Sequence, residues 1–178
     1  ISHFDISRVS LGGPTFDVAK LSWLNGQWLK EMPLPDFMHA FQQWAVNTDY
    51  LSKVAKQIQP RIETLSEAVN WAGFFFAGQV SVTADKLSHK KLSPEEVKKV
   101  MQFGLWELEK VMLWNHETVG ATLQRISTAM GVKLRDFMAP YFIAIAGSSS
   151  STPVMEAMAI LGPDLTFHRL RHGIEALG

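Results

Sequence analysis

The sequence has no cysteine among its 178 residues. That absence excludes a disulfide framework, a zinc site built on cysteine and a thiol nucleophile, and it fits the reducing cytoplasm in which we expect the protein to act. The longest apolar runs, at residues 74–76 and 142–146, are far too short to cross a bilayer, so no membrane partner is expected. The chain begins at Ile1 with neither an initiator Met nor the features of a signal peptide, which favours a fragment of a longer protein.

The sequence also lacks a net charge. The 17 basic residues balance 17 acidic ones, so the formal net charge is +0. Proteins that bind nucleic acid without regard to its sequence are normally basic, because Lys and Arg neutralise the phosphates. Any nucleic-acid binding by this chain would therefore depend on a local patch or on the reading of bases.

The composition that remains is that of a folded protein. Hydrophobic residues make up 47% of the chain and charged residues 19%. A chain of this length can bury roughly two-thirds of its unfolded surface, so it needs no metal or disulfide to fold. We expect one ordinary domain or two small ones packed together.

Apolar residues recur at spacings of three and four almost throughout, which predicts an all-α protein of about eight or nine helices in an irregular cage. Asp17 and Asn47 are predicted to cap helices, and Ser93, followed by Pro94 and then Glu96, has the pattern of a capping box. Residues 78–92 are predicted to form a loop with at most one turn. The expected helices span residues 17–29, 36–46, 50–59, 61–76, 94–114, 115–130, 133–146, 153–161 and 164–177.

Several stretches carry a family resemblance. Their sequences are FDISRVS at residues 4–10, FDVAKLSWLNG at 16–26, QPRIETL at 59–65, APYFIAIAG at 139–147, and TPVME followed by ILG within 152–162. Together they resemble the C-terminal half of bacterial glutamyl-tRNA synthetases, and the FD…KL…WLNG spacing is the most specific of them. Residues 78–128 match that family only in their helical pattern.

The resemblance implies a class I synthetase anticodon-binding region. Residues 1–32 would end a stem-contact region and add a linking helix, residues 33–77 would form a first anticodon-binding helical subdomain, and residues 78–178 a second. The parent enzyme, a glutamate–tRNA ligase, would use ATP and Mg²⁺ to attach glutamate to tRNA(Glu) in a catalytic domain that precedes this region. This chain itself would hold no catalytic residue, metal or cofactor, and we expect it to be a monomer.

The resemblance also implies which residues contact tRNA. Arg61 falls on the arginine that reads the third anticodon base. The other residues implied in anticodon binding are Thr64, Tyr141, Phe142, Ser151, Thr152, Pro153 and Met155. Contacts to the tRNA backbone would come from Lys20, Lys86, Lys90 and Arg169. Phe142 stands where many relatives have Arg, so it would stack on a splayed base rather than donate to one.

The choice of arginine at position 61 has a physical reason. Glutamate anticodons end in cytosine, whose pairing edge offers two acceptors, and the guanidinium is a rigid fork of donors. The alternative is a surface ion pair of Arg61 with Glu63 or Glu67. For residues 147–153, a serine-rich loop ahead of a helix, the alternatives are a polar wall for a base or phosphate and a plain surface connection.

Two patterns and one rival function need weighing. The sequence KLSHK at residues 86–90 is similar to the family's ATP-binding loop, but it lies downstream of the WLNG segment instead of upstream, and the chain has no His-x-Gly-His partner. We therefore interpret it as a solvated basic loop. His168, His172 and Glu175 share a helical face, which is typical of a solvated helix end more often than of a metal site. The rival function is an all-α protein-interaction module derived from such a domain that no longer binds RNA.

Overall fold

The computed structural model describes residues 17–45 and 47–178. The stretch at residues 4–10, part of the family resemblance, lies outside them. The chain divides into two compact units between Trp44 and Ala45, each described here by itself. This division falls at a different place from the subdomain boundaries expected at 32/33 and 77/78, which remain a prediction about tRNA contact.

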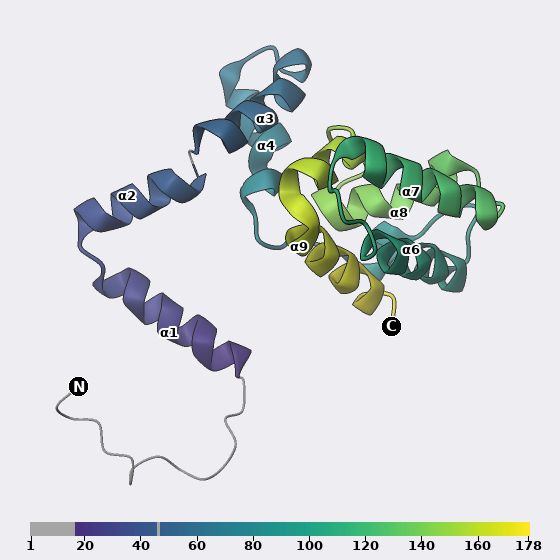
Figure 1. Cartoon of the computed structure of the whole chain (residues 1–178), viewed down its shortest axis with the longest axis horizontal. Coiled ribbons are helices and arrows are strands. Elements are labelled where there is room, and N and C mark those ends of the chain that lie inside the picture. The colour runs from purple at the N-terminus through teal and green to yellow at the C-terminus, as the bar shows by residue number, and fades with distance from the viewer. Residues whose placement is uncertain (1–16, 46) are drawn as a thin grey trace, which may run out of the picture. The chain divides into compact units, whose positions relative to one another are not determined.

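The first unit contains helix α1 (Val18–Glu31) and most of α2 (Leu34–Ala45), seen in purple and blue in Figure 1. Asp17 caps α1 as predicted, and its carboxylate accepts a hydrogen bond from Lys20 N at 3.0 Å. On α2 the rings of Phe37 and Phe41 stack with their centroids 6.2 Å apart, and Trp44 continues the same stripe. The helical spacing of these aromatics is confirmed.

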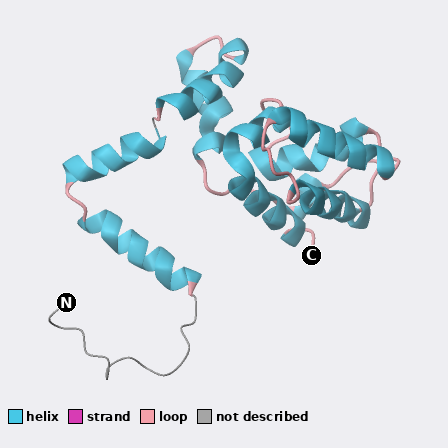
Figure 2. Cartoon of the chain, in the orientation of Figure 1, coloured by secondary structure: helices cyan, strands magenta, loops and turns pink. Residues whose placement is uncertain are grey.

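The described part of the second unit contains seven α-helices, with two short 3₁₀ turns, η2 (Gln59–Arg61) and η3 (Leu65–Glu67), between α3 and α4. The α-helices are α3 (Thr48–Ile58), α4 (Ala68–Phe76), α5 (Ala84–Leu87), α6 (Pro94–Leu108), α7 (His116–Ala129), α8 (Leu134–Ala146) and α9 (Val154–Glu175). No strand occurs in the residues that the structure describes, so the predicted all-α class is confirmed (Figure 2).

Helices α8 and α9 form the most extensive helix pair, and α6 and α7 pack on each other and on α9. The centre of this bundle is largely hydrophobic, with Leu105, Leu123, Ile145 and Leu170 all buried. Helices α3 and α4 also contact the bundle, α3 through α9 and α4 through α8. The end of α4 is thereby held against the end of α8, which creates the site described below.

Local signals set several helix ends. Ser93 Oγ accepts from Glu96 N at 3.2 Å while the Glu96 carboxylate accepts from Ser93 N at 2.7 Å, which confirms the capping box. Gly162, with φ 81° and ψ 170°, interrupts α9. The two helices predicted on either side of this glycine are therefore present, joined across a kink.

Two predicted helices differ from the structure. Residues 61–76 do not form one helix: a 3₁₀ turn (Gln59–Arg61) is followed by extended backbone, a second 3₁₀ turn (Leu65–Glu67) and then α4. Thr64 is extended, and its hydroxyl donates to the Glu67 carboxylate at 2.9 Å, a local bond that competes with helix formation.

The helix predicted to reach Trp114 ends at Leu108. The indole N–H of Trp114 donates to Met158 O on α9 at 3.0 Å, and its ring meets Phe167 edge-on at 5.4 Å. These tertiary contacts hold the segment after α6 against α9, where a continuing helix could not place it.

Candidate nucleic-acid interface

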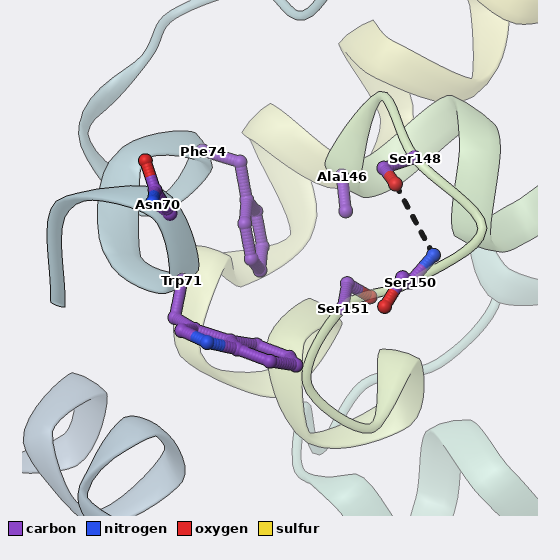
Figure 3. A pocket seen from close by; sticks show the side chains of 7 residues that line it. All are labelled: Asn70, Trp71, Phe74, Ala146, Ser148, Ser150 and Ser151. Carbon is purple, nitrogen blue, oxygen red and sulfur yellow. Dashed lines mark hydrogen bonds between the residues drawn. The ribbon is translucent and has the colours of Figure 1, made fainter. Parts of the chain in front are cut away.

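A pocket of about 340 Å³ opens between α4 and the loop that follows α8 (Figure 3). Its lining residues come from two segments that are more than 70 positions apart in the sequence. They are Asn70, Trp71 and Phe74 on one side and Ala146, Ser148, Ser150 and Ser151 on the other. No charged side chain is among them, so the pocket is an aromatic and hydroxyl-lined site.

Helix α4 supplies the aromatic wall. Trp71 and Phe74 are three positions apart, which puts both rings on one helical face, and Figure 3 shows both directed toward the serine loop. The neighbouring Phe75 is buried in the core. Its burial fixes the rotation of α4, and that rotation leaves Trp71 and Phe74 half-exposed at the pocket.

The loop after α8 supplies the hydroxyl wall. Gly147 ends α8 with φ 74°, and a Cβ at this position would lie 3.3 Å from Val80 Cβ, so both the backbone and the space favour glycine. Beyond it Ser150 N donates to Ser148 Oγ at 3.1 Å, which folds the loop back on itself as Figure 3 shows. These serines therefore give this side of the pocket a polar wall.

The next two residues lead from this wall into α9. Ser151 Oγ donates to Thr152 O at 2.9 Å. Thr152 is fully buried and its hydroxyl has no hydrogen-bond partner within the described part of the chain. A buried hydroxyl without a partner is costly, and this one follows directly on the pocket wall.

The chemistry of the pocket suits a flat, neutral, polar-edged group. Aromatic rings stack on such a group, while hydroxyls and the Asn70 amide can both donate to and accept from its edge. The lining has no cation to attract a phosphate. A splayed nucleobase fits these requirements, since single-stranded bases are read by stacking and by edge hydrogen bonds.

Arg61 and Thr64 lie on the irregular stretch between α3 and α4 and do not line this pocket. Arg61 is half-buried, and its Nη1 donates to Gln57 O at 2.5 Å. Among the described residues it makes no ion pair with Glu63 or Glu67, the surface alternative considered for it. Thr64 is exposed, with its hydroxyl engaged by Ser66 and Glu67.

The structure corrects the role of Tyr141. Its side chain is fully buried, its ring stacks on Phe137 with centroids 5.4 Å apart, and its hydroxyl donates to Val100 O at 3.0 Å. Burial raises the pKa of this phenol well above its ordinary value. The side chain is part of the core and cannot touch a base, because α6 covers it.

Arg169 is a second correction. Its side chain is fully buried and its guanidinium donates to the main-chain carbonyls of Phe74, Ala77 and Ile145. A phosphate of the tRNA backbone cannot reach it there. Sequence reasoning placed it on the surface because arginine in a terminal helix is usually solvated.

The other predicted anticodon contacts are only partly accessible. Phe142 is half-buried and packs against the core, so part of its ring remains open. Pro153 caps α9 without a side-chain hydrogen bond. Met155 is half-buried against α7, where its sulfur would lie 3.1 Å from a Cβ on Gly120.

Three lysines were predicted to contact the tRNA backbone, and all three are exposed: Lys20 on α1, Lys86 on α5, and Lys90 in the loop before α6. Lys86 donates to Ser81 O at 3.1 Å. Lys90 lines a second hollow of about 450 Å³, whose other ionisable residues are His89, Lys91, Arg135 and Asp136. This hollow carries more positive than negative groups, as a phosphate contact requires.

Within residues 17–45 and 47–178, no three His, Asp or Glu side chains come together as a metal-binding group, and His168, His172 and Glu175 form none. In the same residues, no helix combines the length and the apolar character needed to cross a membrane.

Comparison with known proteins decides the family. A family model described as an anticodon binding domain matches residues 36–174. The chain belongs to this anticodon binding domain family. Two similar curated relatives are the glutamate–tRNA ligases of Acinetobacter baumannii (strain SDF), 53% identical, and Psychrobacter cryohalolentis, 50% identical, each over the full 178 residues. The chain spans 36% and 35% of the length of these two relatives.

A solved structure agrees on the fold of this anticodon binding domain. The crystal structure of a glutamate tRNA ligase from Elizabethkingia meningosepticum superposes with a TM-score of 0.67 at 24% identity, covering 98% of this chain and 36% of that one. A second, from Elizabethkingia anophelis, has a TM-score of 0.62 at 22% identity.

Sequence reasoning missed the aromatic wall of the domain's pocket. Trp71 and Phe74 were interpreted as core, because an aromatic at helical spacing usually is. The signal that could have separated them is the run Phe74-Phe75-Phe76: three consecutive aromatics on a helix cannot all face one core, so at least one must face outward.

Proposed function

We propose that this chain is the anticodon-reading part of a glutamate–tRNA ligase and that it selects tRNA(Glu) in the cytoplasm. The pocket between α4 and the serine loop carries the proposal, because its aromatic and hydroxyl lining suits a splayed base and its lack of charge does not suit a phosphate. The match to an anticodon binding domain and the relatives of about half-identical sequence support the same assignment.

Because the chain spans about a third of those relatives, the proposal includes a catalytic part elsewhere in the same protein. That part would bind ATP and Mg²⁺ and attach glutamate to the tRNA. The part described here would contribute selection and positioning. Its neutral charge means that base reading, more than bulk attraction to phosphate, distinguishes the correct tRNA.

In this proposal Arg61 reads the cytosine at the third anticodon position. The hydrogen bond from its Nη1 to Gln57 O fixes the guanidinium at the end of α3. An arginine has five N–H donors, so others remain for the two acceptors on the pairing edge of cytosine. A preoriented donor fork discriminates better than a mobile one, since less side-chain freedom is lost on binding.

The test is binding of tRNA(Glu) and of the same tRNA with its third anticodon base changed from C to G, each at two salt concentrations. We expect a preference for the unaltered tRNA that persists at the higher salt. Arg61→Gln should lower that preference by about 1–3 kcal/mol. Arg171→Gln is the matched control, because Arg171 is an exposed arginine paired with Glu109.

Two outcomes would contradict the proposal. Equal weakening of both tRNAs by Arg61→Gln would remove Arg61 from base reading. No tRNA binding by the unaltered chain even at low salt would favour the rival protein-interaction module.

A further inference from the structure

The buried arginine of α9 joins the two walls of the pocket. Arg169 Nη2 donates to Phe74 O at 2.6 Å and to Ala77 O at 2.5 Å, at the end of α4. Its Nη1 donates to Ile145 O, at the end of α8. Phe74 lines the aromatic wall and Ala146, the neighbour of Ile145, lines the opposite wall (Figure 3). One side chain therefore holds the backbone of both walls.

These carbonyls are the ones a helix leaves without internal partners. The last C=O groups of an α-helix lack a donor and carry the negative end of the helix dipole. Two such ends, those of α4 and α8, converge on the Arg169 guanidinium. No carboxylate pairs with Arg169 among the described residues. The groups that accept hydrogen bonds from its guanidinium are main-chain carbonyls.

The cation persists at neutral pH. Burial lowers the pKa of Arg169 to about 10, and the neighbouring Tyr50 opposes that decrease. Only the rigid fork of a guanidinium reaches three carbonyls on two helices at once; the ammonium of lysine is a compact point charge on a flexible stem.

A second side chain forms a hydrogen bond with the same end of α4. The hydroxyl of Tyr50, on α3, donates to Phe75 O at 2.7 Å. Phe74, Phe75 and Ala77 thus all have their carbonyls bound by side chains from other helices. The aromatic wall is fixed through its backbone, while the half-exposed rings of Trp71 and Phe74, which also pack against the core, keep part of their surface open to the pocket.

We propose that Arg169 is a positioning residue for base recognition: by clamping the ends of α4 and α8 it sets the separation of the aromatic and serine walls, and hence which base the pocket accepts. The inference rests on the proposed anticodon reading. Arg169 lies outside the pocket lining and touches no base itself. Its effect should therefore appear in the discrimination between tRNAs more than in affinity alone.

The experiment measures dissociation constants for tRNA(Glu) and for single-base variants at each of its anticodon positions. The proteins are the unaltered chain, Arg169→Lys, Tyr50→Phe and the control Arg171→Lys, with folding checked by circular dichroism. We expect Arg169→Lys to reduce the preference at one anticodon position on the order of tenfold, because small displacements of a recognition wall have large effects. Tyr50→Phe should reduce it a few-fold, and Arg171→Lys should leave it unchanged.

A folded Arg169→Lys protein that keeps every base preference would overturn the inference, even if its stability falls, because a purely structural role lowers affinity for all tRNAs alike. If Arg169→Lys does not fold, Tyr50→Phe is the deciding variant, because it removes only the hydroxyl that donates to Phe75 O at the same end of α4. An unchanged preference in Tyr50→Phe would then reject the clamp. Absence of any base preference in the unaltered chain would overturn the proposed function, and this inference with it.

Discussion

Replacing Gly104 by alanine tests where Tyr141 lies. Gly104 is buried in the middle of α6, and a Cβ there would come 1.6 Å from Tyr141 Oη and 2.8 Å from Cζ. The phenol cannot easily withdraw, because its ring stacks on Phe137 and its hydroxyl is bonded to Val100 O. Helix propensity alone would make alanine about 1 kcal/mol more favourable than glycine at this position.

Packing should instead make Gly104→Ala destabilising. Overfilling a close-packed site costs about 1–3 kcal/mol, and breaking the buried hydrogen bond of Tyr141 costs about as much again. After subtraction of the helix-propensity gain, we expect Gly104→Ala to destabilise the protein by about 1–5 kcal/mol. Tyr141→Phe alone should cost about 1 kcal/mol.

The double variant gives the sharper result. Removing Tyr141 Oη eliminates the 1.6 Å overlap and leaves only the 2.8 Å approach to Cζ. The double variant should therefore be more stable than the sum of the single effects by at least about 1 kcal/mol. Urea unfolding followed by far-ultraviolet circular dichroism measures these values, provided that the m-values stay equal.

A stabilising Gly104→Ala would refute the placement of Tyr141, because it would mean that nothing opposes the propensity gain. Additive single effects would do the same. In parallel, Tyr141→Phe should bind tRNA as the unaltered chain does. Loss of base preference in that variant would return Tyr141 to the binding surface.

Three further predictions concern the surface. Trp71→Ala should weaken tRNA binding by about 1–3 kcal/mol, the usual contribution of a base stacked on an aromatic side chain. The control Trp106→Ala, at an exposed tryptophan of α6, should leave tRNA binding unchanged. A fluorescence or filter-binding titration compares the two variants. Lys90→Ala should weaken all tRNAs alike and lower the slope of log affinity against log salt by about one, which a salt series measures. The Lys91 ammonium holds the pKa of Asp136 below its ordinary value. The contribution of Asp136 to stability is therefore present above pH 3.8 and is lost as the pH falls below that value. In acid unfolding curves, Asp136→Asn should make this loss of stability smaller.

Much of the fold could be predicted because its signals are local. The capping box at Ser93, the caps at Asp17 and Asn47, and the kink at Gly162 each depend on residues within one turn of the position concerned. Their physics needs no partner from elsewhere in the chain, so a pattern of residue types suffices.

The sequence failed where a distant contact outweighs a local preference. A helix to Trp114 satisfied the apolar spacing, but the hydrogen bond to Met158 O and the contact with Phe167 hold Trp114 elsewhere. Likewise, Arg169 has the residue type and position of a surface cation, and only α4 and α8 make it a buried one.

The sequence by itself determined an all-α protein with defined caps and breaks, and through its motifs the resemblance to an anticodon-binding region. The tertiary structure alone decided which polar and aromatic residues face outward: it placed Tyr141 and Arg169 inside and set Trp71 and Phe74 against the serine loop. The physical reason is that burial depends on how helices far apart in the chain pack, and periodicity fixes a face of a helix without fixing what covers it.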